Sequence, residues 1–280
     1  MIKMRKIKKA TFIILLFSVC IGNAQNWRSH SAKILAEKRF EVGLFQPFRY
    51  GYSETLEYST YPFWFFVMPN LTLKKSHDIL LGYDVASRWS LYYPRPILNM
   101  VSRKGIGGFI DPSLEVPPML GISASMLFTK IISGVGVTFN SGLDIGFSLG
   151  DLDGRVNVEL PLLYHRMSVF HNNYGFHSGV DIEKGLTKKL TMLLDLDFSI
   201  LPGMDTKKSD SGFAKVLGEY SFEHKALLIY EKSETFRLLT GYKFVHGKYP
   251  FGTESRILPF LFLVDTWFPM IELQWGRSLK

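Results

Sequence analysis

The residues of this 280-residue chain best suited to chemistry are carboxylates spaced two apart. Asp181 and Glu183 form one pair, and Asp195 and Asp197 form a second. Because side chains alternate along a β-strand, a spacing of two places both members of a pair on one face. Carboxylates gathered on one face can bind cations, act as acid–base pairs, or draw cations into a water-filled space.

Histidine and serine occur close together, but not in spacings that suit nucleophilic catalysis. A charge relay needs the imidazole to reach the serine hydroxyl. His177 and Ser178 are adjacent and therefore point to opposite faces of a strand, as do His30 and Ser31, and Ser168 lies three residues after His165. We predict no catalytic residues. The histidines are scattered and no acidic calcium loop is present, so we also predict no metal site and no cofactor.

The carboxylate pairs lie in segments where apolar and polar residues alternate. The segments 78–91, 134–150, 190–200 and 213–230 each keep a two-residue period, which predicts β-strands. A strand in a soluble sheet is usually about 5–6 residues long. The segment 213–230 is far longer and needs a different explanation.

The first 24 residues have the features of a secretory signal peptide. Five basic residues precede the apolar run 10–21, and Gly22-Asn23-Ala24 supplies small residues for cleavage before Gln25. The run is too short for a transmembrane helix of about 20 residues, although an uncleaved anchor or a lipid on Cys20 stays open. We therefore expect a signal peptide at 1–24, an N-terminal lead at 25–38 and one domain at 39–280.

Removal of the signal peptide changes the charge. The formal charge falls from +8 to +3, because five basic residues leave and no acidic residue does. Nucleic-acid binding loses its compositional support, so we expect no nucleic-acid partner. The single cysteine also leaves, which excludes an internal disulfide or a thiolate metal site in the mature chain.

Alternation through the whole mature chain fits two architectures. A soluble β protein turns its apolar face to a core, whereas a transmembrane barrel turns it to lipid. Long strands, charged residues on the polar face, and aromatic residues near strand ends favour the membrane barrel. We predict an all-β, transmembrane, antiparallel up-and-down β-barrel of about 12 strands, within a range of 10 to 14. The strand-end aromatic residues are Trp89, Tyr92, Tyr93, Tyr249, Phe251, Trp267, Phe268 and Trp275.

Two short turns, 51–56 and 185–190, share a Gly, an apolar residue, a hydroxyl and a final Leu. In its signal peptide, strand rhythm and turns, the chain resembles Gram-negative outer-membrane β-barrel proteins. The resemblance covers nearly all of the mature chain but names no functional family. It implies location in the outer membrane and contact with outer-membrane lipid.

The expected strand boundaries leave two ambiguities. The segment 54–74 can hide an extra strand, and 255–278 can be one continuous strand. Placing 93–117 outside the cell would also place the turns 51–53 and 185–187 outside, against their periplasmic appearance. The expected strands are 39–51, 54–74, 78–92, 118–130, 133–148, 154–170, 174–184, 188–201, 212–231, 235–247, 255–265 and 268–278.

The connection 93–117 does not alternate. It contains several prolines and glycines together with many apolar residues. A long connection of this kind is usually functional or disordered. We consider a constriction loop that turns Arg95, Arg103 and Lys104 toward the pore, or a surface loop that packs over the barrel mouth.

Along each expected strand, every second residue belongs to the polar set, and these residues are expected to line the lumen. Eleven acids against six bases would attract cations if the lumen holds water. We therefore expect a narrow channel or transporter for ions or small solutes, with a structural or interaction barrel as the alternative and a lipid-modifying enzyme as a third. A twelve-stranded barrel can be open or filled, so conduction stays open. The expected lining residues are Glu41, Asp84, Asp144, Glu159, Asp181, Glu183, Asp195, Asp197, Glu219, Glu223, Glu272, Arg49, Arg88, Lys215, Lys225, Arg237 and Lys243.

Overall fold

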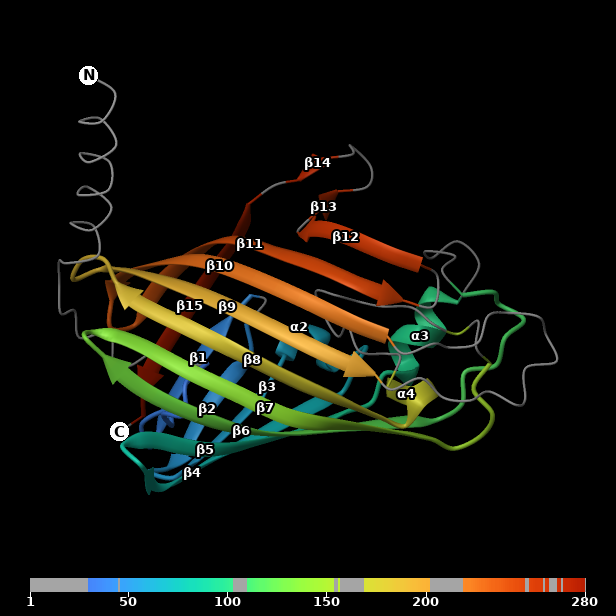
Figure 1. The fold of residues 1–280 in the computed structure, drawn as a ribbon, viewed down its shortest axis with the longest axis horizontal. Helices are drawn as coiled ribbons and strands as arrows, with labels where there is room; N and C mark the ends of the chain where they lie inside the picture. The colour runs from blue at the N-terminus through green and yellow to red at the C-terminus, as the bar shows by residue number, and fades with distance from the viewer. Residues whose placement is uncertain are drawn as a thin grey trace, which may run out of the picture.

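The chain forms a closed, antiparallel, up-and-down β-barrel of 12 strands (Figure 1), which confirms the predicted fold class. This computed structural model describes residues 30–44, 46–102, 110–153, 156, 169–201, 219–249, 252–258, 260–261, 266–267 and 269–279. The expected signal peptide and the first residues of the lead lie outside these ranges.

From β1 to β11 each strand pairs with the next one along the chain, and β15 (Met270–Ser278) closes the ring by pairing with both β11 and β1. The three strands that follow the lead are five or six residues long, whereas the others in the ring have 9 to 15. The remaining strands are β1 (Arg39–Gly43), β2 (Phe48–Ser53), β3 (Leu56–Thr60), β4 (Asn70–Leu80), β5 (Tyr83–Tyr92), β6 (Met119–Ile132), β7 (Val135–Ser148), β8 (Tyr174–Gly185), β9 (Leu190–Leu201), β10 (Glu219–Ser233) and β11 (Phe236–Tyr249).

The last position in the ring is divided between two strands. β15 pairs with residues 236–241 of β11, and β12 (Gly252–Leu258) pairs with residues 243–249. Between them, the short pair β13 (Phe260–Leu261) and β14 (Thr266–Trp267) forms a separate two-stranded sheet that projects from the barrel (Figure 1). The expected strands 255–265 and 268–278 therefore share one place in the ring, beside β11. This is close to the alternative in which 255–278 is one continuous strand.

The count of 12 was correct, but several boundaries were wrong. The segment 39–51 divides into β1 and β2, and 54–74 divides into β3, the helix α2 (Pro62–Phe65) and the start of β4. Pro62 and the uninterrupted apolar run after it do not suit a paired strand, because proline lacks the backbone N–H. The expected strand 154–170 has no place in the wall, since β7 pairs directly with β8. Most of that segment lies outside the described residues, and α4 (Val169–Asn172) is its described end.

The short turns gather at one end of the barrel, here called the turn end. Leu81-Gly82 and Ser133-Gly134 both have positive φ at their two residues, as type I′ hairpin turns require. The antiparallel order places the turns 54–55 and 186–189, the lead and the C-terminus at this end as well. The connections from β5 to β6, β7 to β8 and β9 to β10 leave from the opposite loop end. The segment 93–117 and the short turns 51–53 and 185–187 therefore lie at opposite ends of the barrel. The expected strand boundaries had placed them at the same end.

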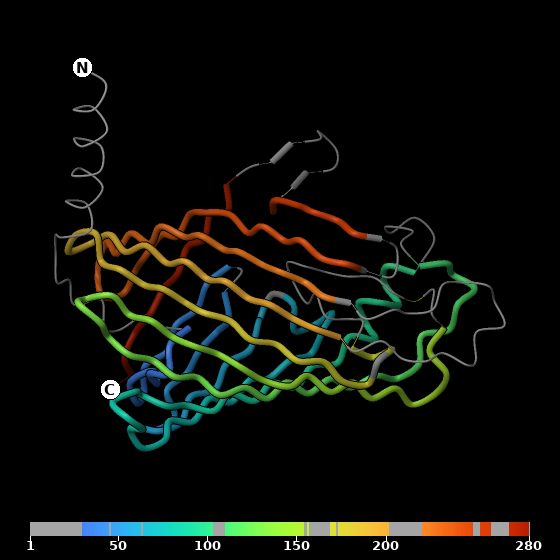
Figure 2. Tube along the Cα trace, viewed as in Figure 1, coloured from blue at the N-terminus to red at the C-terminus, as the bar shows by residue number. Residues whose placement is uncertain are grey.

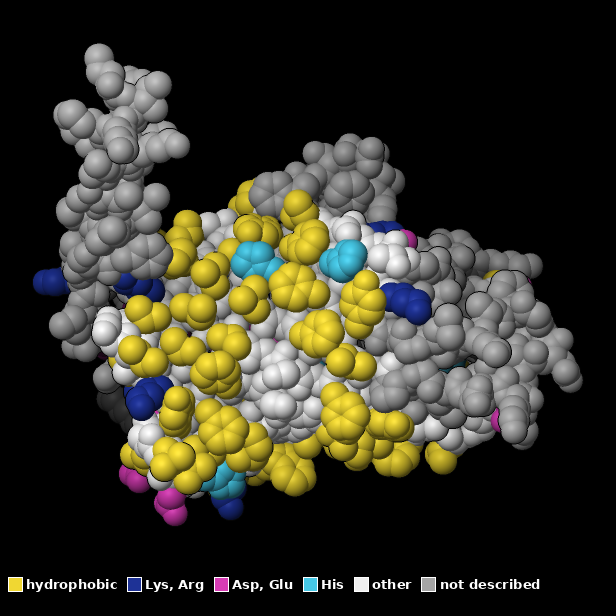
Figure 3. All heavy atoms as spheres, in the orientation of Figure 1, with side chains coloured by type: hydrophobic (Ala, Val, Ile, Leu, Met, Phe, Trp, Pro, Cys, Tyr) yellow, Lys and Arg dark blue, Asp and Glu magenta, His cyan; other side chains and the backbone are white. Residues whose placement is uncertain are grey.

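Apolar side chains face outward and polar side chains face inward. On β10, Phe222, Leu228 and Tyr230 are 37–43% exposed, whereas Ser221 and Glu223 on the other parity are buried. Figure 3 shows hydrophobic side chains spread over the visible face of the barrel, with charged ones toward its ends. Figure 2 shows β1–β3 covering only the part of the wall nearest the turn end.

An apolar cluster closes the loop end, and we call it the cap. The segment 93–117 contributes to it through α3 (Arg95–Val101), a helix that was not expected, and through Val116. The described part of the segment therefore packs in this cluster, and the choice between a constriction loop and a surface loop stays open because residues 103–109 lie outside the described residues. Tyr92 lies in the cap edge-on to Phe170, so its assignment to an aromatic girdle was wrong. The cap consists of Met68, Tyr92, Ile97, Leu98, Val101, Ile110, Val116, Met119, Val156, Val169, Phe170 and Leu201.

The helices α2, α3 and α4 have four, seven and four residues. No helix in the described part of the chain has the length and apolar character needed to cross a bilayer.

Leu98 is fully buried in the cap, so Leu98→Ala should lower the free energy of unfolding by about 2–5 kcal/mol. Leu149→Ala, at a side chain that is 77% exposed near the same end, is the control and should have little effect. Denaturant titration followed by tryptophan fluorescence measures both. Equal losses in the two variants would show that the cap is not packed as described.

His171 gives the cap a pH dependence. Burial lowers the pKa of its imidazole, whose Nε2 lies 3.0 Å from the Val156 carbonyl oxygen. The unfolded chain, with a pKa of about 6.5, then binds the proton first, so this contribution to stability is present above about pH 6.5 and is lost as pH falls. The drop in unfolding free energy between pH 7.5 and 5.5 should be smaller in His171→Gln, which keeps a donor and does not titrate. An identical drop in both proteins would contradict this placement of His171.

Candidate functional site

The lead lies against the inner wall near the turn end. The Ala32 N–H donates to Thr129 Oγ1 at 2.7 Å, and the Leu35 N–H donates to Glu57 Oε2 at 2.8 Å. The backbone passes so close to β2 that a Cβ on Gly51 would lie 2.1 Å from the Ala36 carbonyl oxygen. Only glycine fits at this position, which shows that the backbone of the lead packs directly against β2.

A row of alternating charges crosses β1 to β4 on the inner face. Arg49 lies at its centre, because its guanidinium makes two 2.8 Å bonds to the Glu57 carboxylate and one 2.8 Å bond to Glu41. Arg39 Nε binds Glu41 Oε1 at 3.1 Å, and Lys74 Nζ lies 3.6 Å from Glu57 Oε2. All five side chains are buried, so each charge depends on its neighbours for solvation.

A second charged row crosses β8 to β11. Asp181 is directly opposite Asp195, which is directly opposite Lys225, and the next residue in the row is Lys243. Lys225 forms an ion pair with Asp195, and Lys243 binds Glu223 at 2.8 Å. The Oδ1 atom of Asp181 is buried and has no hydrogen-bond partner among the described residues.

His30 is the residue of the lead that lies beside this second row. Its Nδ1 lies 3.9 Å from Asp181 Oδ1, and its exposed quarter faces the lumen. Burial lowers the pKa of this imidazole to about 3, and the nearby Lys225 ammonium adds to the effect. At physiological pH the imidazole is therefore neutral and can present a lone pair.

Two further polar groups face the same space. His177 Nδ1 lies 2.9 Å from Asp144 Oδ2, with both side chains buried. Arg88 donates from Nε to Ser125 Oγ at 3.2 Å and forms no ion pair within the described part of the chain. The imidazole of His177, bonded through Nδ1, and the guanidinium of Arg88 both line the cavity described next.

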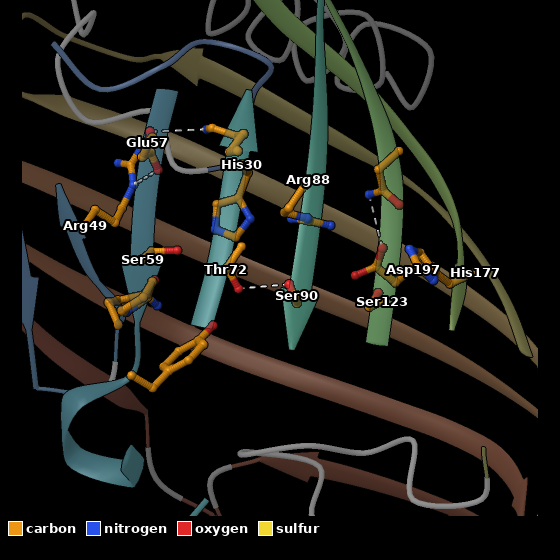
Figure 4. Close-up of a pocket in the computed structure, with 15 residues that line it drawn as sticks. His30, Arg49, Glu57, Ser59, Thr72, Arg88, Ser90, Ser123, His177 and Asp197 are labelled. Atoms are coloured by element: carbon orange, nitrogen blue, oxygen red, sulfur yellow. Dashed lines mark hydrogen bonds and ion pairs between the residues drawn. The ribbon is translucent and has the colours of Figure 1, made fainter. Parts of the chain in front are cut away.

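His30, Arg88 and His177 line a polar cavity of about 260 Å³ inside the barrel. Figure 4 shows His30 between the Arg49–Glu57 pair and Arg88, with His177 and Asp197 farther along the wall. Basic side chains of β2, β4 and β5 therefore lie across the cavity from Asp197, to which Asn140 donates at 3.3 Å. The hydroxyls Ser59, Thr72, Ser90 and Ser123 line the space between.

The structure places most of the expected lining residues on the inner face. Asp144, Asp181, Asp195, Glu223 and Arg237 are at most 5% exposed, and Arg237 donates to Gln274. Asp84 shares the inner face because it is directly opposite Thr129, and Asp181 and Glu183 lie on one parity of β8. Arg88 and Asp197 reach the cavity, whereas Lys243 lies away from it, bonded to Glu223.

Other expected site residues are not placed at the cavity. Arg95 donates to the Val116 carbonyl at 3.0 Å, so it ties the cap together rather than facing a pore. Arg103, Lys104, Glu159 and Lys215 lie outside the described residues. Glu219 begins β10, and its side chain is not described.

Sequence reasoning missed several site residues, among them His30, Glu57, Lys74 and His177. Glu57 and Lys74 were hidden because the segment 54–74 was treated as one strand. Within β4, the parity of Thr72, Lys74 and Ser76 would have placed Lys74 inside. His177 was set aside because its neighbour Ser178 faces the other way, which is correct but does not test a partner on another strand.

Neither a scan against protein-family models nor a search of the curated proteins gave a match. The function of this site is therefore argued from its geometry.

Replacement of Arg49 should be severe. Arg49→Met leaves Glu41 and Glu57 buried without their main counter-charge, so we expect a loss of about 3–5 kcal/mol in unfolding free energy. The double variant Arg49→Met/Glu57→Gln should recover part of the loss, because it removes one of the two orphaned charges.

The control is Arg256→Met in the more exposed Arg256–Glu254 pair of β12, which should cost about 1 kcal/mol or less. Denaturant titration compares all four proteins. A double variant less stable than Arg49→Met would contradict the charge explanation.

Proposed function

We propose that the chain is an outer-membrane β-barrel that admits ions or small polar solutes to its lumen and passes them when the lead moves. The observation that carries the proposal is the polar cavity of about 260 Å³ enclosed by a ring of strands with an apolar exterior. The chain is then a narrow, gated channel or transporter.

The distribution of side chains supports the membrane part of the proposal. Phe139, Phe147, Phe198 and Ile200 are 43–49% exposed on the outer face, while the neighbouring Thr138, Asn140, Asp144 and Ser199 are buried. A soluble barrel would place these two sets the other way round. Lipid cannot hydrogen-bond to backbone N–H and C=O groups, so a sheet within a bilayer must pair these groups itself. Closure of the ring through β15 meets this requirement. Outer-membrane lipid is accordingly the expected surrounding partner.

The charges support passage of a polar solute. Arg49, Lys74 and Arg88 line one side of the cavity, and Asp197 lies across from them. Fixed charges of opposite sign in a space with low-dielectric walls produce a field that orients ions and dipolar solutes. Glu41, Glu57, Asp195 and Glu223 are each bonded to a lysine or an arginine, so the acidic excess counted in the sequence overstates the charge available to a solute.

The lead and the cap lie toward opposite ends of the barrel in the described structure. The lead occupies the turn end, where Leu193, Leu227, Ile229 and Leu239 add an apolar cluster on the inner face. The cap covers the loop end. We infer that passage requires displacement of the lead, which is held mainly by hydrogen bonds, rather than of the cap.

The filled turn end favours one alternative, a barrel that binds a solute or an envelope protein and does not conduct. The expectation that the chain is not an enzyme stays a prediction. The buried His177–Asp144 pair is the arrangement to test first should hydrolysis of lipid be observed.

The test is planar-bilayer conductance of the refolded chain, compared with a variant in which residues 30–36 are replaced by glycine and serine at equal length. The replacement removes His30 and the apolar contact of Ala32 while the barrel strands stay intact, so conductance steps should become larger or more frequent. The control replaces the exposed turn residues 187–189 in the same way. A heat-shifted gel band confirms folding of each protein.

Folded proteins that are all silent would contradict a channel and favour the binding barrel. Steps of equal size in all three would keep the channel but contradict gating by the lead.

A further inference from the structure

We propose that His30, Asp181 and Asp195 bind one divalent transition-metal ion, with Zn²⁺ as the reference ion, and that this ion fastens the lead to β8 and β9. The site does not depend on whether the barrel conducts.

The three residues converge from separate parts of the chain. Their ligand atoms, one from each side chain, all lie within 4.8 Å of one another, and the His30 Nδ1 to Asp181 Oδ1 distance is 3.9 Å. Asp181 and Asp195 are direct cross-strand partners on the inner face. Like charges at directly opposed positions destabilise a sheet, so this pair calls for a cation between or beside its members.

The protein's own cations do not satisfy both carboxylates. Lys225 is directly opposite Asp195 and forms its ion pair there. Asp181 is 5% exposed, and its Oδ1 lacks a hydrogen-bond partner among the described residues while it points toward His30. A buried polar atom left without a partner destabilises the folded chain, and more so when it is charged. A bound cation would remove that cost.

Space for coordination is present beside the cluster. His30, Asp181, Thr129 and Thr138 line a separate void of about 10 Å³, close to the volume that one water molecule requires. Such a void can hold a metal-bound water that completes a four-coordinate site. The Thr129 hydroxyl, which also bonds Thr138 and the Ala32 N–H, would orient that water.

The donor set points to a transition metal. One imidazole nitrogen and two carboxylates suit Zn²⁺ or Mn²⁺, whereas Ca²⁺ and Mg²⁺ prefer oxygen ligands alone. Tetrahedral ligands with bonds of about 2.0 Å lie about 3.3 Å apart, so the ligand atoms must draw together by up to about 1.5 Å. The lead can make that movement, because it is not part of the paired wall.

No pattern along the chain predicts this site. His30 precedes the first strand, and the two aspartates lie on neighbouring strands, so no fixed spacing along the chain records their contact. The prediction of no metal site rested on spacing alone, which does not test residues brought together by barrel closure.

The experiment is Zn²⁺ binding by the untagged, chelator-treated chain in detergent micelles, measured by isothermal titration calorimetry. We expect one equivalent, with affinity reduced at least tenfold in His30→Ala and in Asp181→Asn. His246→Ala is the matched control, because that histidine lies on β11 against Ser255 and should leave binding unchanged. Zn²⁺ should also raise the midpoint of unfolding of the wild type but not of His30→Ala.

No Zn²⁺ binding by the folded wild type would overturn the proposal, as would binding that survives both substitutions. Equal affinity for Mg²⁺ and no effect of His30→Ala would also overturn it, because the imidazole would then have no part. Should Asp181→Asn not fold, His30→Ala still decides the result. Conductance measured with chelator present tests the channel separately, so either proposal can fail alone.

Discussion

The bidentate pair between Arg49 and Glu57 is the interaction on which the inner face of the barrel depends. Arg49 also binds Glu41, and Glu57 accepts a hydrogen bond from the Leu35 backbone and lies near Lys74. Arg49 and Glu57 therefore help to join β1, β2 and β3, position one wall of the cavity and hold the lead. In an interior without bulk water such a pair is worth little by itself, but loss of one member leaves the other charge buried.

The outward apolar face follows from the same constraint. If the exterior contacts lipid, the strands must place their polar residues inside, where charge must be matched by charge. The two rows of ion pairs, one on β1–β4 and one on β8–β11, are the result. Where the matching is incomplete, at Asp181 and Arg88, the lumen retains capacity to bind something else.

Much of this architecture could be predicted from alternation alone. The period of two identified β6 to β11 and their inward carboxylates, because long strands with one polar face leave little ambiguity. Alternation failed at 39–74, where three short strands and α2 follow one another and no single period runs long enough to mark a boundary. It also failed at 93–117, where α3 forms because its apolar residues pack into the cap and not because of a local helical pattern. The contacts of His30 and His177 depend on barrel closure and register, which the sequence does not record.

Residues 32–35 contact the inner wall, where we propose that the lead closes the lumen. The most direct measurement is hydrogen–deuterium exchange of the Ala32 and Leu35 amides in the folded barrel, followed by mass spectrometry of short peptides. Both amides donate to side chains of the wall, so we expect protection comparable to that of β1 and β2. Exchange of these two amides at the rate of an unstructured chain, with the strands still protected, would show that the lead lies outside the barrel and would contradict the account.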